Sequence, residues 1–374
     1  MITKSNEFWT PKRLLETDDR IFLVVGGRGV GKTFNVTGEA LDDLFFNNVS
    51  MVYLRRLGVE IDELEKNNFI TEEMLRVYFG NRFSDFNADE SKQIMRFSID
   101  GAIHEIKAIR NKIFFDDRCI VYFIALSRAG HVKSNNYPDV KYLVFDEVII
   151  DRSIMPNARY IRNEFTVLLN LIETIKRKRE DFYLFMLSNV GENFNPIFAG
   201  LGYYLTHEDI KKGFVKREDY CVQFVENKQE ELNMTDPFVR LGAKNRDFSN
   251  SKTNAFENIR TPYFKHYGKK PKLLVKYDRQ YLGIAERKIP SGLEYYYQVY
   301  KTLDGLENIT VFNNNFDTLM EDEVFLEETQ LKKKFKTYFE LFQQNMVYHE
   351  SPETFLEWSK FVYALKLEHH HHHH

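Results

Sequence analysis

Residues 26–33 read Gly-Gly-Arg-Gly-Val-Gly-Lys-Thr, a spacing of residue types that can hold a phosphate group. They follow the apolar run 20–25 and precede an amphipathic stretch, so we expect a strand, a tight turn and a helix in that order. The glycines permit left-handed backbone, which turns N–H groups inward at the positive end of the helix. The nucleotide-binding residues predicted from this pattern are Gly26, Gly27, Arg28, Gly29, Val30, Gly31, Lys32 and Thr33. Lys32 is expected to reach the β- and γ-phosphates, and the Thr33 hydroxyl is expected to ligate Mg²⁺.

Two acids, Asp146 and Glu147, end a second apolar run at the point where a phosphate loop needs a carboxylate. We expect Asp146 to hold Mg²⁺, directly or through water. Glu147 is the next residue and should point the other way along the strand, where it could polarise the attacking water as general base. An adjacent Asp-Glu pair favours NTP-hydrolysing motors over GTPases or small-molecule kinases. The Asn-Lys-x-Asp pattern that reads guanine does not occur, so ATP is the preferred nucleotide.

Three further polar segments are candidates for coupling hydrolysis to motion. Ser188 and Asn189 end the apolar run 182–187 and either sense the γ-phosphate or cap the strand end. The basic run 176–179 ends a predicted helix, where it either interacts with the helix macrodipole or supplies an arginine finger to a neighbouring subunit. Lys133 lies in the polar, turn-rich segment 128–138 and is either a second basic contact or a surface lysine.

The elements that must position these residues are strands with apolar residues on both faces. Strands of this kind belong in a mainly parallel sheet covered by helices, which predicts an α/β fold for the N-terminal half. The predicted strands occupy 20–25, 50–56, 119–127, 141–147 and 182–189. Hairpins with turns near Asp100-Gly101 and Asp116-Asp117 are expected before the strand that ends in Asp146, and a helix with one apolar stripe is expected between 159 and 180.

The composition excludes several classes of protein. The 374 residues include 52 basic and 55 acidic side chains, for a net charge of −3, so a nucleic-acid surface would have to be a local patch. The two cysteines have neither redox nor zinc spacing, which suits a reducing cytoplasm. No apolar run approaches 18 residues and no signal peptide is evident, which predicts a soluble protein without a membrane partner.

The length predicts two domains. We expect an ATPase domain over 1–205, a charged linker or hinge over 206–235, and a smaller α+β domain over 236–366. Residues 367–374 read as an expression tag.

Taken together, the motifs resemble those of the terminase-like DNA-packaging motor ATPases of small podophages, the Picovirinae and Salasmaviridae group. The resemblance rests on "GGRGVGKT", "YLRR", "KSNNYPDVKYLVFDE", "LLNLIETIKRKRE" and "LSNVGENFNP", in that order between residues 21 and 196. It implies a P-loop ATPase of the ASCE class that uses ATP and Mg²⁺ to pump double-stranded DNA into a prohead. It further implies a homo-oligomeric ring, a pentamer, in the host cytoplasm and transiently at the portal vertex, with a packaging RNA as a possible partner.

The resemblance also implies roles for single residues. Arg28 matches a P-loop arginine shared with large terminases, Arg177 matches an arginine finger acting in trans, and Lys133 matches a second basic residue acting in trans. Arg179 remains an alternative finger because the run is rich in basic residues. The C-terminal domain resembles a nuclease of the RNase H type that has lost its acids, and Asp278 is the only acid in the hairpin 272–285, so nuclease activity is not expected. The alternatives are a nuclease-competent large terminase and a P-loop scaffold that uses ATP only to assemble.

Overall fold

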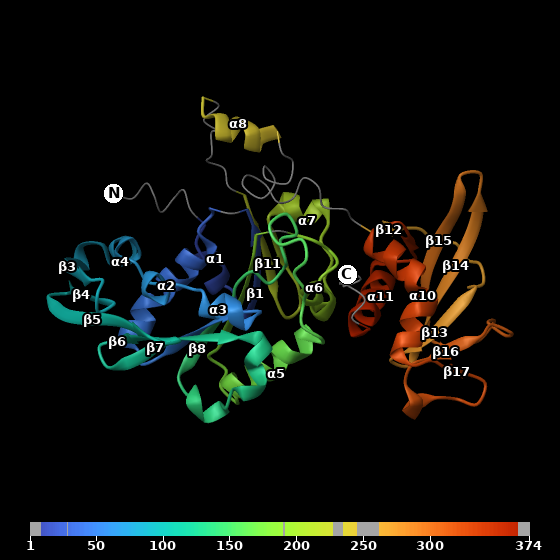
Figure 1. The fold of residues 1–374 in the computed structure, drawn as a ribbon, viewed down its shortest axis with the longest axis horizontal. Helices are drawn as coiled ribbons and strands as arrows, with labels where there is room; N and C mark the ends of the chain where they lie inside the picture. The colour runs from blue at the N-terminus through green and yellow to red at the C-terminus, as the bar shows by residue number, and fades with distance from the viewer. Residues whose placement is uncertain (1–8, 28, 190, 227–234, 245–261, 366–374) are drawn as a thin grey trace. The chain divides into compact units, whose positions relative to one another are not determined.

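A computed structural model describes residues 9–27, 29–189, 191–226, 235–244 and 262–365. The chain divides into two compact units (Figure 1). The N-terminal unit comprises 1–161, 166–191 and 207–258, and the C-terminal unit comprises 162–165, 192–206 and 259–374. Arg28, the predicted tag over 367–374 and part of the predicted linker lie outside the described residues.

The N-terminal unit is built on one mixed sheet with the strand order β10-β11-β1-β9-β8-β2-β7-β6-β5-β4-β3. Strands β11, β1, β9, β8, β2 and β7 run parallel to one another. The hairpin strands β6 to β3 extend the sheet in antiparallel fashion at one edge, and β10 pairs antiparallel with β11 at the other. The strands are β1 (Ile21–Gly26), β2 (Ser50–Arg55), β3 (Phe83–Asp89), β4 (Ile94–Ile99), β5 (Ala102–Ile109), β6 (Lys112–Phe115), β7 (Arg118–Ala125), β8 (Val140–Phe145), β9 (Tyr183–Ser188), β10 (Phe214–Lys216) and β11 (Cys221–Val225). The predicted α/β class and mainly parallel core are confirmed.

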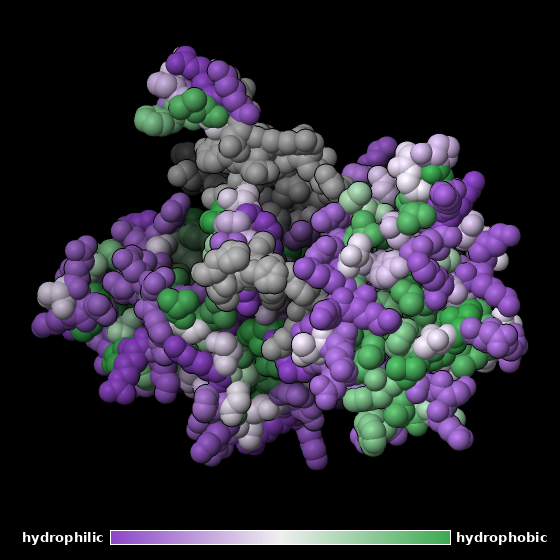
Figure 2. Space-filling view, turned by 45° about the vertical axis from the view of Figure 1, so that its right-hand side comes forward, coloured by the Kyte–Doolittle hydropathy of each residue, from purple (hydrophilic) through white to green (hydrophobic). Residues whose placement is uncertain are grey.

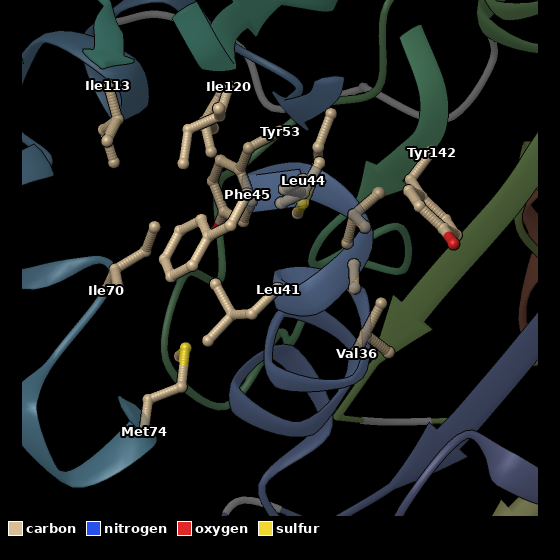
Figure 3. Packing of buried hydrophobic residues seen from close by; sticks show 14 of the residues in the cluster. Val36, Leu41, Leu44, Phe45, Tyr53, Ile70, Met74, Ile113, Ile120 and Tyr142 are labelled. Atoms are coloured by element: carbon tan, nitrogen blue, oxygen red, sulfur yellow. The ribbon is translucent and has the colours of Figure 1, made fainter. Parts of the chain in front are cut away.

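The helices of this unit are α1 (Lys12–Leu15), α2 (Lys32–Phe46), α3 (Gly58–Asp62), α4 (Glu72–Phe79), α5 (Glu164–Lys176, which begins in the C-terminal unit), α7 (His207–Lys212) and α8 (Pro237–Lys244). Among them, α2 connects β1 to β2 and α5 connects β8 to β9. Short 3-10 turns occupy η1 (Lys66–Asn68), η2 (Gly80–Arg82), η3 (Leu126–His131) and η4 (Ser134–Asn136). Helix α2 buries Leu41, Leu44 and Phe45 in the main core, where they lie beside Ile70, Met74 and Tyr53 (Figure 3).

The predicted hairpins before β8 are present, with residues in left-handed backbone at their turns. Asp100 (φ 51°) and Gly101 (φ 80°) join β4 to β5, and Asp116 (φ 53°) joins β6 to β7. Left-handed turn residues match the twist of two-residue hairpins, and Asp, Asn and Gly tolerate this conformation best.

The structure differs from the prediction over 206–235. Instead of a linker, residues 207–225 form α7, β10 and β11, and β11 pairs in parallel with β1. Cys221 and Val222 are fully buried in that strand. Strand β11 forms hydrogen bonds with β1, the strand that leads into the phosphate loop. Without this segment, β1 would have no strand partner on that side.

The C-terminal unit contains a second sheet with the order β12-β18-β15-β14-β13-β16-β17. Its strands are β12 (Tyr263–Phe264), β13 (Leu273–Tyr277), β14 (Gln280–Ile289), β15 (Gly292–Tyr300), β16 (Val311–Asn313), β17 (Val324–Phe325) and β18 (Tyr348–His349). The helical elements are α6 (Pro196–Leu201), η5 (Phe316–Thr318), α10 (Glu328–Gln343) and α11 (Pro352–Ala364). The predicted β segments and both C-terminal helices are present, so the smaller α+β unit is confirmed.

The limits of this unit differ from the predicted 236–366. It starts at 259 and also takes in 192–206, because Phe194 and Tyr204 pack against the aromatic core formed by α10 and α11. Polar residues cover most of the face shown in Figure 2, and hydrophobic residues gather over parts of the C-terminal unit. None of the described helices is both long enough and apolar enough to span a bilayer.

Candidate nucleotide-binding and hydrolysis site

The predicted phosphate loop joins β1 to α2 at the carboxyl end of the parallel strands. Gly29 (φ 88°) and Gly31 (φ 77°) adopt left-handed backbone, and Gly31 is the N-cap of α2. Side chains at these positions would be strained, which is the physical reason for glycine there. The loop therefore presents the start of a 15-residue helix to whatever occupies the space before it.

Lys32 lies folded back against this loop. Its ammonium donates to the carbonyl oxygens of Gly26 (3.0 Å) and Gly27 (3.2 Å) and to Asn189 Oδ1 (2.9 Å). Burial lowers the pKa of Lys32 to about 8, against the opposing effect of Asp146 and Glu147. A buried cation whose hydrogen-bond partners among the described residues are neutral oxygens is ready to exchange them for an anionic ligand.

Asp146 follows β8 and faces the first turn of α2. Its Oδ2 accepts hydrogen bonds from the Thr33 hydroxyl (2.8 Å) and from the Tyr53 phenol (2.7 Å), while its Oδ1 accepts from the Glu147 backbone N–H (3.0 Å). Burial, reinforced by the Asp146 carboxylate, raises the pKa of Tyr53 well above its ordinary value, so the phenol keeps its proton. The predicted pair of Thr33 and Asp146 is therefore brought together.

Glu147 differs from its predicted orientation. Strand β8 ends at Phe145, and Glu147 adopts left-handed backbone (φ 55°), so strand alternation does not apply to it. Its Oε2 lies 2.5 Å from Arg55 Nη2, and the same nitrogen lies 2.5 Å from Glu60 Oε2. Burial raises the pKa of the Glu147 carboxyl, while Arg55 opposes that rise. Both carboxylates of the Asp-Glu pair thus face residues of β2, Tyr53 and Arg55.

Arg56 holds the backbone of this elbow. Its guanidinium donates to the carbonyl oxygens of Glu147 (3.3 Å) and Val148 (2.6 Å), and it lies 4.6 Å from the ring centroid of Tyr160. Only 5% of the side chain is exposed. These contacts tie the left-handed residue Glu147 to the end of β2.

Ser188 and Asn189 lie at the end of β9, next to the phosphate-loop strand. Ser188 is buried and pairs in register with Val25 of β1. Asn189 accepts a hydrogen bond from Lys32 through its Oδ1. Asn189, a residue predicted from the sequence, is thus in direct contact with the phosphate-loop lysine.

Arg177 and Lys133 are brought together at a different edge of the sheet. The Arg177 Nη2 donates to the hydroxyl of Ser134 (2.7 Å), the residue next to Lys133, and both basic side chains belong to exposed residues. The segment of Lys133 leads into the start of β8 and Arg177 precedes the start of β9, whereas Glu147 follows the end of β8. Six residues of extended strand span roughly 20 Å. These two residues therefore lie at the edge opposite to the phosphate loop of their own chain.

Arg179 has a different environment from Arg177. Its Nη2 donates to the Ile175 carbonyl (2.6 Å) and its Nε donates to the Lys176 carbonyl (3.2 Å), so it caps the C-terminus of α5. Burial lowers its pKa. Capping by a cation satisfies the free carbonyls at a helix end.

The residues fit a magnesium nucleotide. Oxygen donors on Thr33 and Asp146 match the preference of Mg²⁺ for hard ligands, and most of its remaining ligands normally come from phosphates and water. Lys32 and the start of α2 supply the positive charge that polyphosphate needs. Among the described residues there is no group of three or more His, Cys, Asp and Glu side chains arranged to hold a metal without such help.

Sequence reasoning missed Tyr53, Arg55, Arg56 and Glu60 as parts of the site. The signal available was the position of Arg55 and Arg56 at the carboxyl end of an apolar parallel strand, because ligands bind at the carboxyl ends of such strands. Glu60 had no such signal, since its role depends on the turn that carries α3 back toward β2.

In the sheet, β9 lies between β1, which leads into the phosphate loop, and β8, which leads into the Asp-Glu pair. Thr33 contacts Asp146 of that pair. This arrangement defines the P-loop fold of the ASCE class. A family model described as Podovirus DNA encapsidation protein (Gp16) matches residues 3–230, more than half of the chain. The chain belongs to this family.

Individual relatives agree with this assignment. The chain is 26% identical over 216 residues to the DNA packaging protein of Bacillus phage phi29, and 28% identical over 215 residues to that of Bacillus phage B103. Each alignment covers 58% of this chain, but only 55% and 57% of the respective relative, so the chain spans little more than half of the curated relatives it matches.

Solved structures extend the similarity to the fold. A chain of the bacteriophage Phi-29 viral genome packaging motor assembly matches with a TM-score of 0.63 and 18% identity, over 96% of this chain and 99% of that chain. The N-terminal domain of the DNA packaging ATPase from bacteriophage phi29 matches with a TM-score of 0.47 and 25% identity, over 59% of this chain and 98% of that chain.

Proposed function

We propose that this chain is the ATP-hydrolysing subunit of a motor that moves double-stranded DNA into a viral prohead. Family membership and the similar fold of a packaging-motor chain support a role in DNA packaging. The observation that carries the proposal is the division of the predicted catalytic set between two edges of one sheet. Lys32, Thr33, Asp146 and Glu147 lie at one edge, and Arg177 with Lys133 lies at the other.

The geometry supports a defined role for each group at the phosphate loop. Lys32 leaves its carbonyl partners and binds the β- and γ-phosphates, while Thr33 and Asp146 hold Mg²⁺. The metal, when bound, neutralises charge on the phosphate oxygens. Glu147 accepts the proton of the attacking water, which requires Arg55 to give up at least one carboxylate oxygen of Glu147. When Lys32 moves to the phosphates, Asn189 loses its hydrogen bond to Lys32 and is free to contact the γ-phosphate. Its contacts then depend on whether the γ-phosphate is present, which is the coupling role proposed for Ser188 and Asn189.

A second copy of the chain completes the site in this proposal. Arg177 and Lys133 approach the nucleotide of the neighbouring subunit, where added positive charge is worth about 10³–10⁵ in rate. Arg177 is the better candidate for the finger because Arg179 is used as a helix cap. Contacts of this kind are head-to-tail, and head-to-tail contacts form a ring when the rotation between subunits closes.

The partners follow from the family. We propose a homo-oligomeric ring, a pentamer, acting in the host cytoplasm at the portal vertex of the prohead, with a packaging RNA as a further partner. DNA is gripped through its phosphates, so binding should weaken steeply with salt. We propose no nuclease activity, because Asp278 is the only acid in the hairpin 272–285 and sits in its turn (φ 46°), whereas a two-metal nuclease needs several converging carboxylates. Metal-dependent cutting of plasmid DNA would instead favour the terminase alternative.

The first experiment tests the chemistry at the phosphate loop. Lys32→Ala and Glu147→Gln should each abolish DNA-stimulated ATP hydrolysis, the first by removing phosphate binding and the second by removing the base. Steady-state phosphate release measures both variants. Retained hydrolysis in Glu147→Gln would exclude it as the base, and oligomers without any DNA-stimulated hydrolysis in the wild type would favour the scaffold alternative.

The second experiment tests whether a neighbouring subunit contributes Arg177 to the site. Arg177→Ala subunits mixed with Lys32→Ala subunits should recover part of the activity, because some interfaces then pair an intact phosphate loop with an intact Arg177. Lys178→Ala, an exposed neighbour on the same run, is the matched control and should remain active alone. If activity recovers at no mixing ratio, Arg177 does not act across an interface.

A further inference from the structure

The carboxylate of Asp146 is held by three donors from three separate parts of the chain. Thr33 belongs to α2, Tyr53 to β2, and the Glu147 N–H to the elbow after β8. The Thr33 hydroxyl and the Glu147 N–H come with the P-loop arrangement itself. The Tyr53 phenol is an additional donor, and it bonds the same oxygen, Oδ2, that accepts from Thr33.

The ring of Tyr53 is fixed in the core, so its hydroxyl has a fixed position. Only 3% of Tyr53 is exposed, and its ring makes edge contacts with Phe69 (5.0 Å between centroids) and Phe123 (5.7 Å). Figure 3 shows Tyr53 among the buried side chains of α2 and neighbouring elements. A phenol held this way loses little further side-chain freedom when it orients a partner.

Packing alone does not hold Asp146. A pocket of about 400 Å³ adjoins its carboxylate and is lined by Thr33, Tyr53, Phe69 and Asp146 among others. A carboxylate beside such a space can rotate unless hydrogen bonds restrain it. The bond from Tyr53 is therefore positioned to set which way Oδ2 and Oδ1 point.

We propose that Tyr53 is a positioning residue that orients Asp146 for binding of Mg²⁺ with the nucleotide. The proposal rests on the proposed function of Thr33 and Asp146 as the metal-binding pair. A group that hydrogen-bonds a metal ligand fixes its orientation, and removing such a group typically lowers metal affinity about 10- to 100-fold. Removal of the Tyr53 hydroxyl should therefore weaken the binding of Mg²⁺ without weakening nucleotide binding in the absence of Mg²⁺.

The test uses the full chain and the variant Tyr53→Phe, which deletes one oxygen atom. Binding of a fluorescent ADP analogue is measured in EDTA and then across a Mg²⁺ titration. Tyr53→Phe should bind the analogue in EDTA within about twofold of the wild type, and should require about 10- to 100-fold more Mg²⁺ for the metal-dependent change. This readout does not depend on turnover.

Tyr142→Phe is the matched control. The Tyr142 hydroxyl also donates to a carboxylate, Asp43 Oδ2, at 2.7 Å, and the residue is 8% exposed on the adjacent strand β8. It should change neither titration. Equal weakening of binding with and without Mg²⁺ in Tyr53→Phe, or a Mg²⁺ curve identical to the wild type, would overturn the proposal.

Asp146→Asn separates this inference from the proposed function. A shifted Mg²⁺ curve in Asp146→Asn together with an unshifted curve in Tyr53→Phe would reject the role of Tyr53 alone. An unshifted curve in Asp146→Asn would reject the metal site and the role of Tyr53 together. Mg²⁺ shifts in both variants without ATP hydrolysis by the wild type would reject the motor and leave the role of Tyr53 supported.

Discussion

Glu147 occupies a backbone conformation that is costly for a residue other than glycine. A left-handed conformation costs roughly 1–2 kcal/mol relative to the right-handed region, and Glu147 has φ 55°. Arg56 offsets this cost by binding the carbonyl oxygens of Glu147 and Val148. The consequence is that consecutive carboxylates face the same strand, with Asp146 on Tyr53 and Glu147 on Arg55. Left-handed backbone at a residue other than glycine is found more often at active sites, which agrees with the role proposed for Glu147.

Lys32 should take up a proton when nucleotide binds at alkaline pH. Its pKa is about 8 because burial disfavours the ammonium form, and bound phosphates would favour that form. Deprotonation of the free protein therefore weakens nucleotide binding as the pH rises above 8. With this pKa, binding takes up about half a proton at pH 8 and about nine-tenths at pH 9.

Calorimetry of ADP binding in buffers with different heats of ionisation measures this uptake. Lys32→Arg keeps its charge throughout the range and should abolish the uptake in whatever binding remains. Heats that do not depend on the buffer in the wild type would contradict a titrating Lys32.

At the scale of elements, β18 carries a buried histidine whose pKa is strongly lowered in the folded chain. His349 is 1% exposed, Phe342, Phe355 and Tyr297 surround its ring, and its Nδ1 has no hydrogen-bond partner among the described residues. Burial lowers its pKa to about 3. The unfolded chain takes up a proton on this residue near pH 6.5, whereas the folded chain does not.

The C-terminal unit should therefore lose stability as the pH falls from about 6.5 toward 3, by up to about 1.4 kcal/mol per pH unit from His349 alone. His349→Phe suits the aromatic surroundings and should flatten this part of the dependence, as measured by urea unfolding between pH 7 and pH 5. An unchanged slope in His349→Phe would show that other groups dominate.

The sequence predicts the strands whose residues are buried on both faces of the sheet. It misses strands and contacts that depend on residues far away in the chain. The runs that became β1, β2, β7, β8 and β9 are continuous and apolar, and the P-loop follows from its spacing. Strand β11 has only five residues and lies in a charged stretch, so its sequence shows no clear strand pattern. The strand is defined by its pairing with β1, which is about 200 residues away in the chain. The pairing of Arg55 with Glu147 joins residues 92 apart, and no local pattern encodes it.

At the scale of the whole molecule, the two units are interleaved along the chain. The chain leaves the N-terminal unit briefly over 162–165 and again at 192, returns at 207 to add β10 and β11, and leaves once more at 259. The sequence-predicted boundary at 205 would thus cut a domain before its sheet is complete. Strand β1, which carries the phosphate loop, would become an edge strand with its side toward β11 unpaired.

A fragment of residues 1–205 should consequently fail to fold, while a fragment of residues 1–226 should fold. Strand β11 buries Val222 (0% exposed) and Phe224 (7%). Each large apolar side chain contributes about 1.5–3 kcal/mol, against a total stability of about 5–15 kcal/mol for a domain. Both fragments contain residues 192–205 without the rest of the C-terminal unit, so this destabilising feature is common to both and cancels in the comparison. Gel filtration and thermal unfolding by circular dichroism measure the difference.

Two substitutions in the longer fragment test the contribution of β11. Val222→Asp should reproduce the loss of folding, whereas Asp219→Ala, in the exposed turn between β10 and β11, should not. Cooperative unfolding of the 1–205 fragment at the midpoint of the longer one would mean that β11 is dispensable for the sheet that carries the phosphate loop.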